Sequence, residues 1–306
     1  MRVGFIGLGT MGGPMALNVR KAGHDLVVHD KRPESANPLI AEGARWAKEI
    51  ADVARESEVV FTSLPRPVDV ETVGGELLQH MGKGTAWFDL TTSSPSLIQR
   101  LQPEFLKRGI ALLDAPVSGG PRGAKSGQLA IWVGGDRVEF DRRLPLLNAI
   151  GDQVLYIGPI GTGLVAKLVN NCAHYAIQTA VAEIFTLGVR GGVDPLTLWS
   201  ALRQGSSGRM RTFDRLGRHF LQGVFDPPDF ALGLAHKDVT LSLELARELE
   251  VPMRVAALTH AEMTEALRRG WSERDSRVAM LLQEERAGVD IKVSVADIKS
   301  VMDRDP

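Results

Sequence analysis

The distribution of apolar residues changes about halfway along the chain. Up to about residue 161, short apolar runs alternate with stretches, such as 33–42 and 96–108, in which apolar residues recur at helical spacing. The apolar runs occupy residues 3–6, 26–29, 58–64, 85–90, 110–114 and 129–133. A repeated strand–helix–strand order is typical of an α/β fold in which helices cover both faces of a parallel sheet. The pattern therefore predicts a doubly wound N-terminal domain.

Beyond residue 161 the pattern becomes helical throughout. Residues 163–190 contain no proline and are mostly small or apolar, which is typical of a long buried helix. Further helical stretches are expected at 195–203, 210–221, 237–249, 255–268 and 273–285, and no strand or internal repeat is evident there. The sequence therefore predicts two domains, 1–162 and an all-helical 163–306, joined at a long helix.

A glycine-rich hexamer directly follows the first apolar run. It reads Gly7-Leu8-Gly9-Thr10-Met11-Gly12 and lies between a predicted strand and a predicted helix. In this context the first glycine permits a tight turn, the second lets the backbone approach a pyrophosphate, and the third packs helix against strand. The N–H groups at the helix start bind the phosphates. The motif therefore predicts that residues 1–162 form a Rossmann domain that binds a dinucleotide.

The residues after the second apolar run bear on which dinucleotide binds. Asp30 follows that run, about 20 residues beyond the glycines, where a carboxylate accepts hydrogen bonds from the adenosine ribose hydroxyls. This position favours NAD, because a 2′-phosphate would meet the carboxylate as a like charge. Lys31 and Arg32 follow at once and can bind that phosphate, unless they form only a solvated turn. NAD is the expected cofactor, with NADP as the alternative.

Composition narrows the class of protein and its partners. Hydrophobic residues make up 44% of the 306 residues and charged residues 24%, which is typical of a folded protein. The formal net charge of -1 argues against nucleic acid or an anionic membrane as the main partner. No apolar run reaches the roughly 18 residues of a membrane span, and the N-terminus lacks the apolar region of a secretory leader. We therefore expect a cytoplasmic protein.

Two further segments combine residue types that suit a substrate with a carboxylate. Consecutive small residues, as in Ser118-Gly119-Gly120, can present backbone N–H groups to an anion. Lys167 and Asn171 are four residues apart and share one face of the predicted apolar helix. Burying a lysine there lowers its pKa, which suits an acid–base catalyst near neutral pH. The alternative for the first segment is an ordinary glycine turn, and the alternative for Lys167 is a side chain whose ammonium group reaches water.

Four segments, in order along the chain, carry a resemblance to a known family. They read Gly7-Leu8-Gly9-Thr10-Met11-Gly12-Gly13-Pro14-Met15-Ala16-Leu17-Asn18, Asp114-Ala115-Pro116-Val117-Ser118-Gly119-Gly120, Gly163-Leu164-Val165-Ala166-Lys167-Leu168-Val169-Asn170-Asn171 and His236-Lys237-Asp238. The chain thereby resembles the β-hydroxyacid dehydrogenases, which include 3-hydroxyisobutyrate dehydrogenases and tartronate semialdehyde reductases. The resemblance implies hydride transfer between NAD(P) and the hydroxyl carbon of a small 3-hydroxy acid, or the matching semialdehyde.

The resemblance also implies roles for the matching residues. On the substrate side, Lys167 is the general acid and base and Asn171 orients the alcohol. The carboxylate-binding residues are Ser118, Gly119 and Gly120.

On the cofactor side, the resemblance implies that Lys237 closes over the site and that Thr92 lies near the nicotinamide ribose. Leu64 and Pro65 match positions that line the cofactor. The family often has Ser-Thr where this chain has Thr91-Thr92, so the hydroxyl is retained. The resemblance also implies a homodimer or homotetramer, and an apolar helix that one small domain does not cover favours association.

Several alternatives stay open at this stage. An NADPH-dependent reductase of glyoxylate or succinic semialdehyde, an imine reductase and a non-catalytic dinucleotide-binding module share the predicted architecture. The last two usually replace the lysine at the position of Lys167, which this chain keeps. Arg209 or Arg211 can pair with a second substrate carboxylate, or they lie in a solvated loop between helices. Phe230 can line the substrate pocket or belong to the hydrophobic core. A single cysteine, Cys172, and no carboxylates clustered near His174 predict no metal site.

Overall fold

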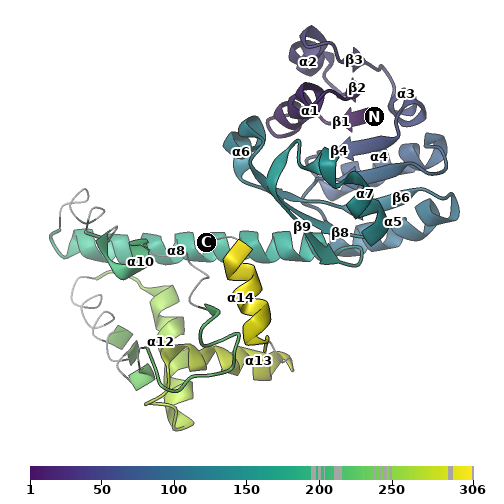
Figure 1. Ribbon diagram of the computed structural model, residues 1–306. Coiled ribbons are helices and arrows are strands. Elements are labelled where there is room, and N and C mark those ends of the chain that lie inside the picture. Colours follow the sequence, from purple (N-terminus) through teal and green to yellow (C-terminus); the bar gives the residue numbers. More distant parts are fainter. Residues whose placement is uncertain are drawn as a thin grey trace. The chain divides into compact units, whose positions relative to one another are not determined.

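The computed structural model describes residues 1–193, 198, 201–202, 204–209, 216–229, 231–233, 235–236, 239–240, 243, 247, 250–288 and 292–304. The chain divides into two compact units, Met1–Ala173 and His174–Pro306. Figure 1 shows a sheet flanked by helices in the first unit and helices in the second.

The first unit is built on one nine-stranded sheet. Its strand order is β3-β2-β1-β4-β5-β6-β8-β7, and β9 pairs with β8. All six predicted apolar runs form strands, which are β1 (Arg2–Ile6), β2 (Asp25–His29), β4 (Val59–Thr62), β5 (Ala86–Asp89), β6 (Ala111–Asp114) and β8 (Leu129–Gly134). The strands from β3 to β6 pair in parallel. The predicted doubly wound fold is therefore confirmed.

Three strands and one change of direction were not predicted. β3 (Arg45–Trp46) and β7 (Val117–Ser118) have two residues each, too short for a period-two pattern. β9 (Gly151–Gly158) is largely exposed, so polar residues interrupt its apolar ones. β8 runs antiparallel to β6 and β7, so the sheet is parallel only in part. Short or half-exposed strands leave little apolar signal in a sequence.

Helices cover both faces of this sheet. They are α1 (Gly12–Lys21), α2 (Asn37–Ala41), α3 (Ile50–Glu56), α4 (Pro67–His80), α5 (Pro95–Lys107), α6 (Gly120–Ser126) and α7 (Arg137–Leu147), with a 3₁₀ turn η1 at Pro33–Ala36. Neighbouring residues of β1 enter opposite cores, since Phe5 packs in one apolar cluster and Ile6 in the other. This alternation follows from the period of two along a strand.

A long helix, α8 (Thr162–Arg190), begins where the sequence predicted it and extends over 29 residues. The predicted boundary at 162/163 coincides with the helix start, whereas the two compact units divide after Ala173, within the helix. The first turns of α8 belong to the first unit because they pack on the sheet; Leu164, for example, is fully buried in one of its cores. Among the described residues, no helix is long and apolar enough to cross a membrane.

The second unit consists of helices and turns in the residues described. These are α10 (Ser206–Arg209), α12 (Arg254–Arg268), the 3₁₀ helix η3 (Ser276–Met280), α13 (Leu281–Ala287) and α14 (Val295–Arg304). The stretch predicted at 255–268 is α12, and the one at 273–285 becomes η3 followed by α13. α14 was not predicted, and the stretches at 195–203 and 237–249 fall largely outside the described residues.

The helix predicted at 210–221 is wrong over most of its described part, because residues 217–221 form turns. Side chains satisfy backbone carbonyls there in place of helical bonds. The Nε2 of Gln222 donates to the carbonyl of Gly217 at 2.9 Å, and the Nδ1 of His219 lies 2.9 Å from the carbonyl of Val224. Such local side-chain bonds compete with the helical ladder.

Candidate functional site

The glycine loop between β1 and α1 has the geometry that a pyrophosphate requires. Gly7 adopts a φ of 91°, and a Cβ there would lie 2.3 Å from the carbonyl oxygen of Ser63. A Cβ on Gly12 would lie 1.9 Å from the carbonyl oxygen of Gly7, so α1 packs directly on the loop. Gly9, in contrast, faces open space, because a Cβ on it would have no atom of the described residues within 4 Å. The loop is therefore closed against the protein at two glycines and open to a ligand at the third.

The start of α1 is free to receive an anion. Within the described part of the chain no side chain caps it at Met11, and its first turn contains no acidic residue. Backbone N–H groups at such a helix start attract phosphate through hydrogen bonds and through the helix dipole.

Asp30 lies just beyond β2 and supports the loop from the side. Its Oδ2 accepts a hydrogen bond of 2.7 Å from the backbone N–H of Leu8, and its Oδ1 accepts one of 2.9 Å from the N–H of Arg32. The Leu8 side chain is buried in the core. Leu8 was predicted to bind the cofactor; in the structure its N–H group donates to Asp30.

Lys31, which follows Asp30 in the chain, shares the carboxylate of Asp69 with Arg66. The Nζ of Lys31 lies 3.6 Å from Asp69, and Arg66 donates two hydrogen bonds, of 2.9 and 3.1 Å, to the same carboxylate. These bonds, together with the nearby lysine, hold the pKa of Asp69 below its usual range. The Arg32 guanidinium stays 3.8 Å from Asp30. Lys31 and Arg32 therefore place positive charge beside the two carboxylates of this part of the cavity.

A cavity of about 670 Å³ opens over these elements. Most of the predicted cofactor residues line it, namely Gly7, Gly9, Thr10, Met11, Gly12, Asp30, Lys31, Leu64 and Pro65. Its volume falls in the range of small-molecule and cofactor sites, about 300–1,000 Å³. The open face at Gly9 and the uncapped helix start fit a dinucleotide, so the residues present match the cofactor that the motif predicts.

The structure separates the two threonines after β5. Thr91 is buried, and its Oγ1 accepts a hydrogen bond of 3.0 Å from the backbone N–H of Leu64, next to the cofactor cavity. Thr92, the predicted cofactor contact, is exposed. Thr91 therefore holds the segment Leu64–Pro65 in place, while Thr92 is the residue of the pair that can reach a ligand.

Sequence reasoning missed a buried polar group beneath this segment. The Oδ1 of Asp89 accepts hydrogen bonds from the hydroxyl of Thr62 at 2.7 Å and from the N–H of Thr91 at 3.2 Å. Its Oδ2 is buried and has no hydrogen-bond partner among the residues that the structure describes. Burial raises the pKa of Asp89 to about 6, although the bonds to Oδ1 partly oppose the shift. An Asp at a strand end is a weak signal, because the sequence does not show that both neighbouring strands cover it.

The small-residue loop Ser118-Gly119-Gly120 joins β7 to α6. Gly119 and Gly120 have φ values of 128° and 61°, which favour glycine. Ser118 pairs with Ala130 of β8, and a Cβ on Gly120 would meet no described atom within 4 Å. The loop thus presents open backbone next to a hydroxyl, as an anion-binding loop needs.

Lys167 lies on the second full turn of α8 and is only 8% exposed. Its Nζ is 6.0 Å from the centroid of the Trp132 ring on β8. A ring face stabilises an ammonium by about 0.5–2 kcal/mol, whereas burial penalises the charged form. The effect of burial is larger than that of the ring, because the pKa of Lys167 is lowered from 10.5. Asn171 lies one turn further along, where its Oδ1 is 3.4 Å from the Nδ2 of Asn170.

The two substrate elements are tied to the same strand. The N–H of Trp132 on β8 donates to the carbonyl of Pro116 at 3.2 Å, two residues before Ser118. Trp132 also contacts Lys167 through its ring. β8 therefore connects the predicted carboxylate loop and the predicted acid–base residue within one unit.

Asp114 was part of a recognised motif, but the role of its side chain emerges only from the structure. It ends β6 and is fully buried, and its two oxygens accept hydrogen bonds of 2.6 Å from Gly161 N–H and 2.7 Å from Leu164 N–H. Burial raises the pKa of Asp114, while these bonds oppose the rise. A Cβ on Gly163 would lie 2.2 Å from the carbonyl oxygen of Trp132. The start of α8 is thus bonded closely to the sheet.

The second unit contributes less to the site as described. Lys237, Phe230 and Arg211, all singled out in the sequence, lie outside the described residues. Arg209 ends the short helix α10 and is exposed. A cavity of about 810 Å³ in this unit is lined by a mixture of apolar and polar side chains, and the described residues around it include none of the predicted site residues. Apart from Arg209, the candidate site residues that the structure describes therefore belong to the first unit.

Comparisons with known proteins agree with this geometry. A family described as the NAD binding domain of 6-phosphogluconate dehydrogenase matches residues 2–158, and one described as the NAD-binding of NADP-dependent 3-hydroxyisobutyrate dehydrogenase matches residues 161–282. The chain is 33% identical to 2-(hydroxymethyl)glutarate dehydrogenase of Eubacterium barkeri, covering 95% of this chain and 97% of that protein. It is 35% identical to the mitochondrial 3-hydroxyisobutyrate dehydrogenase of Homo sapiens, covering 92% and 87%.

A solved structure shares the fold along nearly the whole chain. The 3-hydroxyisobutyrate dehydrogenase of Mycobacterium tuberculosis, described with L-serine, superposes with a TM-score of 0.64 at 25% identity. The alignment covers 92% of this chain and 98% of that one.

Proposed function

The chain belongs to the β-hydroxyacid dehydrogenase family of the 3-hydroxyisobutyrate dehydrogenase type, and we propose that Lys167 is the acid–base group of its reaction. As a member it is an NAD(P)-dependent oxidoreductase that acts on the hydroxyl group of a small hydroxy acid. The observation that carries the proposal is a lysine 8% exposed on α8, whose pKa burial lowers. A buried amine with a lowered pKa exists in the neutral form at a lower pH than a surface lysine does.

The other steps of the reaction are proton transfer, binding of the substrate carboxylate and orientation of the alcohol. The neutral Nζ of Lys167 takes the proton from the substrate hydroxyl, and as an ammonium it returns that proton in the reverse direction. Ser118, Gly119 and Gly120 bind the substrate carboxylate, and Asn171, one turn from Lys167, orients the alcohol. A bound NAD(P) supplies the hydride acceptor or donor. Positioned acid–base groups of this kind contribute about 10²- to 10⁴-fold to the rate.

For the cofactor, we propose contacts from Gly7, Gly9, Thr10, Met11 and Gly12 to the pyrophosphate, supported by the cavity that these residues line. Asp30 accepts from the ribose hydroxyls, which favours NAD, and Lys31 lies beside it. Leu64 and Pro65 line the same cavity, and exposed Thr92 follows the next strand. We propose Lys237 as a further cofactor contact because its segment of the sequence resembles that of the family.

For the substrate, we propose a 3-hydroxy acid of the 3-hydroxyisobutyrate type or the matching semialdehyde. A second candidate is a hydroxymethyl acid with another carboxylate, which is favoured by the similarity to 2-(hydroxymethyl)glutarate dehydrogenase and by exposed Arg209. Guanidinium groups suit bidentate recognition of a carboxylate. Reduction of glyoxylate or succinic semialdehyde is the third alternative.

A substrate screen tests this proposal, with turnover followed by the absorbance of the reduced cofactor. Oxidation of 3-hydroxyisobutyrate, 2-(hydroxymethyl)glutarate and L-serine would be assayed with NAD and with NADP, and reduction of glyoxylate and succinic semialdehyde with the reduced forms. We expect turnover of at least one hydroxy acid by the wild type and a loss of about 10²- to 10⁴-fold in Lys167→Ala. Cofactor binding without any turnover would favour the non-catalytic module. Full activity in Lys167→Ala would exclude the assigned role.

We also propose that the protein works as a homodimer or homotetramer in the cytoplasm. Several large apolar side chains of α8 are exposed, including those of Val165, Val169 and Ile184. Exposed apolar surface of this kind often marks an interface between subunits. Light scattering on the purified protein measures its mass in solution, and a monomer would contradict the assembly; fractionation of cells tests the location.

A further inference from the structure

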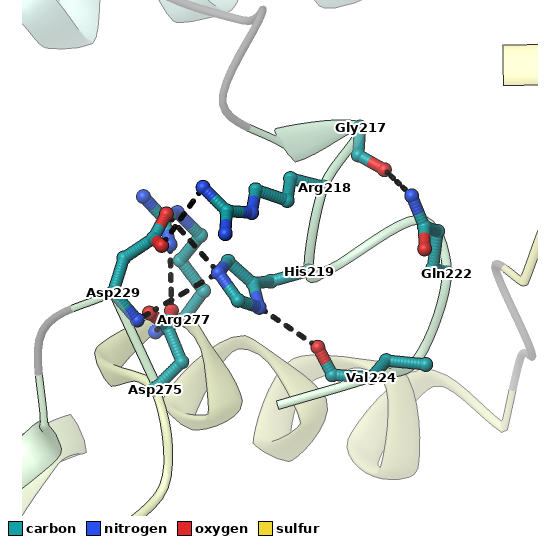
Figure 2. Close-up of polar contacts among 8 residues, drawn as sticks. All are labelled: Gly217, Arg218, His219, Gln222, Val224, Asp229, Asp275 and Arg277. Atoms are coloured by element: carbon teal, nitrogen blue, oxygen red, sulfur yellow. Dashed lines mark hydrogen bonds and ion pairs between the residues drawn. The ribbon is translucent and has the colours of Figure 1, made fainter. Parts of the chain in front are cut away.

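Three side chains of types that bind metal ions converge in the second unit. His219 lies in the turn region 217–223, Asp229 in the segment that follows it, and Asp275 at the N-terminus of η3. Figure 2 shows the ring of His219 directed at both carboxylates. Its Nε2 is 3.2 Å from Asp229 Oδ2 and 3.6 Å from Asp275 Oδ2. No sequence pattern predicts this cluster, because its members are far apart along the chain.

The tautomer of His219 follows from its other nitrogen. Nδ1 lies 2.9 Å from the carbonyl of Val224, which can only accept, so Nδ1 carries a proton. In the neutral ring, the lone pair is therefore on Nε2, the atom that faces the carboxylates. A histidine that ligates a metal almost always donates its second N–H to a carbonyl or carboxylate in this way.

The Nε2 atom is buried and unsatisfied. His219 is 4% exposed, and among the described residues Nε2 has no hydrogen-bond partner. At 3.2 Å from Asp229, the direction of the ring nitrogen rather than the distance is what prevents a hydrogen bond. Nε2 thus lies near both carboxylates but forms a hydrogen bond with neither. A larger cation placed among the three atoms can contact all of them.

The outer carboxylate oxygens are already held by arginines. Arg218 contacts Asp229 Oδ1 at 3.0 Å, and Arg277 contacts Asp275 Oδ1 at 2.7 Å. The inner oxygen of Asp275 accepts a hydrogen bond of 3.0 Å from the Asp229 N–H. Ligating carboxylates in metal sites are commonly oriented by such bonds. The arginines thus bind Oδ1 of each carboxylate, and the two Oδ2 atoms lie 3.2 and 3.6 Å from Nε2.

The two separations from Nε2 are close to those around a small tetrahedral ion. Nitrogen and oxygen ligands about 2.0–2.2 Å from zinc, at tetrahedral angles, stand about 3.3–3.6 Å apart. The separations of 3.2 and 3.6 Å lie at the ends of this range, and all three ligand atoms lie within 4.8 Å of one another. Asp229 is 34% exposed at its side chain, which leaves a route from solvent and room for a water as fourth ligand.

We propose that His219 Nε2, Asp229 Oδ2 and Asp275 Oδ2 bind one divalent transition-metal ion of the zinc type. The ion links the turn that contains His219 to the start of η3. It acts as a structural clamp within the second unit, independent of the hydride-transfer site.

Zinc titration of the full-length protein tests the proposal. Protein stripped with a chelator would be titrated with zinc chloride by calorimetry, and its unfolding temperature measured with and without zinc. We expect one zinc per chain and a higher unfolding temperature in its presence, since a ligand that binds only the folded state stabilises it. Asp229→Asn, which keeps the backbone N–H bond to Asp275, and His219→Gln should each weaken zinc binding at least tenfold.

A matched control comes from another histidine pair in the same unit. His236 and His260 stack with ring centroids 4.3 Å apart, and they are the obvious competing site for added zinc. His260→Gln should bind zinc as the wild type does. Loss of binding in His260→Gln, or equal binding by Asp229→Asn and the wild type, would overturn the proposal. Absence of zinc binding by the wild type would also overturn it.

Discussion

Asp114 Oδ2 accepts a hydrogen bond of 2.7 Å from the backbone N–H of Leu164, three residues before Lys167. The other oxygen of the same carboxylate accepts from Gly161, so the end of β6 is bonded to the first turn of α8 at two points. Negative charge at a helix N-terminus is favourable. Within the first unit, this pairing determines where α8 begins and hence where Lys167 lies relative to Trp132.

Asp114→Asn should therefore affect both stability and turnover. The amide replaces one acceptor by a donor that faces a backbone N–H, and an unsatisfied buried group costs about 1–3 kcal/mol. Chemical denaturation measures this loss, and we expect kcat to fall while the cofactor Kd is unchanged. Asp136→Asn is a matched control, because Asp136 caps α7 by accepting from Glu139 N–H on an exposed surface. Equal kcat in both variants would contradict a positioning role for Asp114.

The pH dependence of oxidation should report on Lys167. The neutral amine is the proton acceptor, and burial lowers the pKa of Lys167 from 10.5. The rate constant kcat/KM for oxidation should thus rise with pH and level off below pH 10.5. Lys167→Ala should abolish this rise and lose about 10²- to 10⁴-fold in kcat. Lys107→Ala, on an exposed lysine of α5, should leave the profile unchanged; a wild-type profile without the rise would contradict the assignment.

Two glycine variants should separate folding from cofactor binding. Gly9→Ala adds a methyl group where no described atom lies within 4 Å, so its free energy of unfolding should stay within about 0.5 kcal/mol of the wild type. Its cofactor affinity should nevertheless fall at least tenfold, because the backbone approaches the pyrophosphate there. Gly12→Ala should lose both stability and cofactor affinity, since its Cβ would lie 1.9 Å from the carbonyl oxygen of Gly7. Fluorescence titration and denaturation measure the two quantities, and tight binding by Gly9→Ala would argue against this pyrophosphate position.

Asp89 should make stability depend on pH between about 4 and 6. Its pKa is raised from 3.8 to about 6 in the folded state, so the folded state binds more protons than the unfolded one in this window. The stabilising contribution is present below pH 3.8 and is lost as pH rises through about 6. At about 1.4 kcal/mol per pKa unit this amounts to about 3 kcal/mol. Asp89→Asn should remove this dependence on pH. The difference in unfolding free energy between variant and wild type should therefore change between about pH 4 and 6. A difference that stays constant over this range would contradict the raised pKa of Asp89.

Arg32 should influence the choice between NAD and NADP. Its guanidinium lies beside Asp30 at 3.8 Å and can form charge-assisted bonds to a 2′-phosphate. Arg32→Ala should raise KM for NADP at least tenfold and KM for NAD by less than about threefold, since such bonds contribute about 1.5–3 kcal/mol. Lys31→Ala is the comparison, because Lys31 is already paired with Asp69. Equal increases for both cofactors would show that Arg32 does not contact the phosphate.

The sequence alone determined the doubly wound sheet, the long helix and the position of the glycine loop. Each of these depends on neighbours close in sequence. Alternating apolar runs predict buried strands, and Gly7 to Gly12 encode a turn whose geometry is local. The motif around Lys167 identified a candidate acid–base residue, and the structure adds that it is buried on one face of α8.

Only the tertiary structure decided which polar groups meet across long separations. Asp114 and Leu164 are 50 residues apart, and Thr91 rather than Thr92 turns inward because Leu64 on a neighbouring segment offers it an N–H. The cluster of His219, Asp229 and Asp275 likewise forms from a turn, a loop and a helix start. Hydrogen bonds and burial of this kind depend on packing between segments, which periodicity along a single chain does not record.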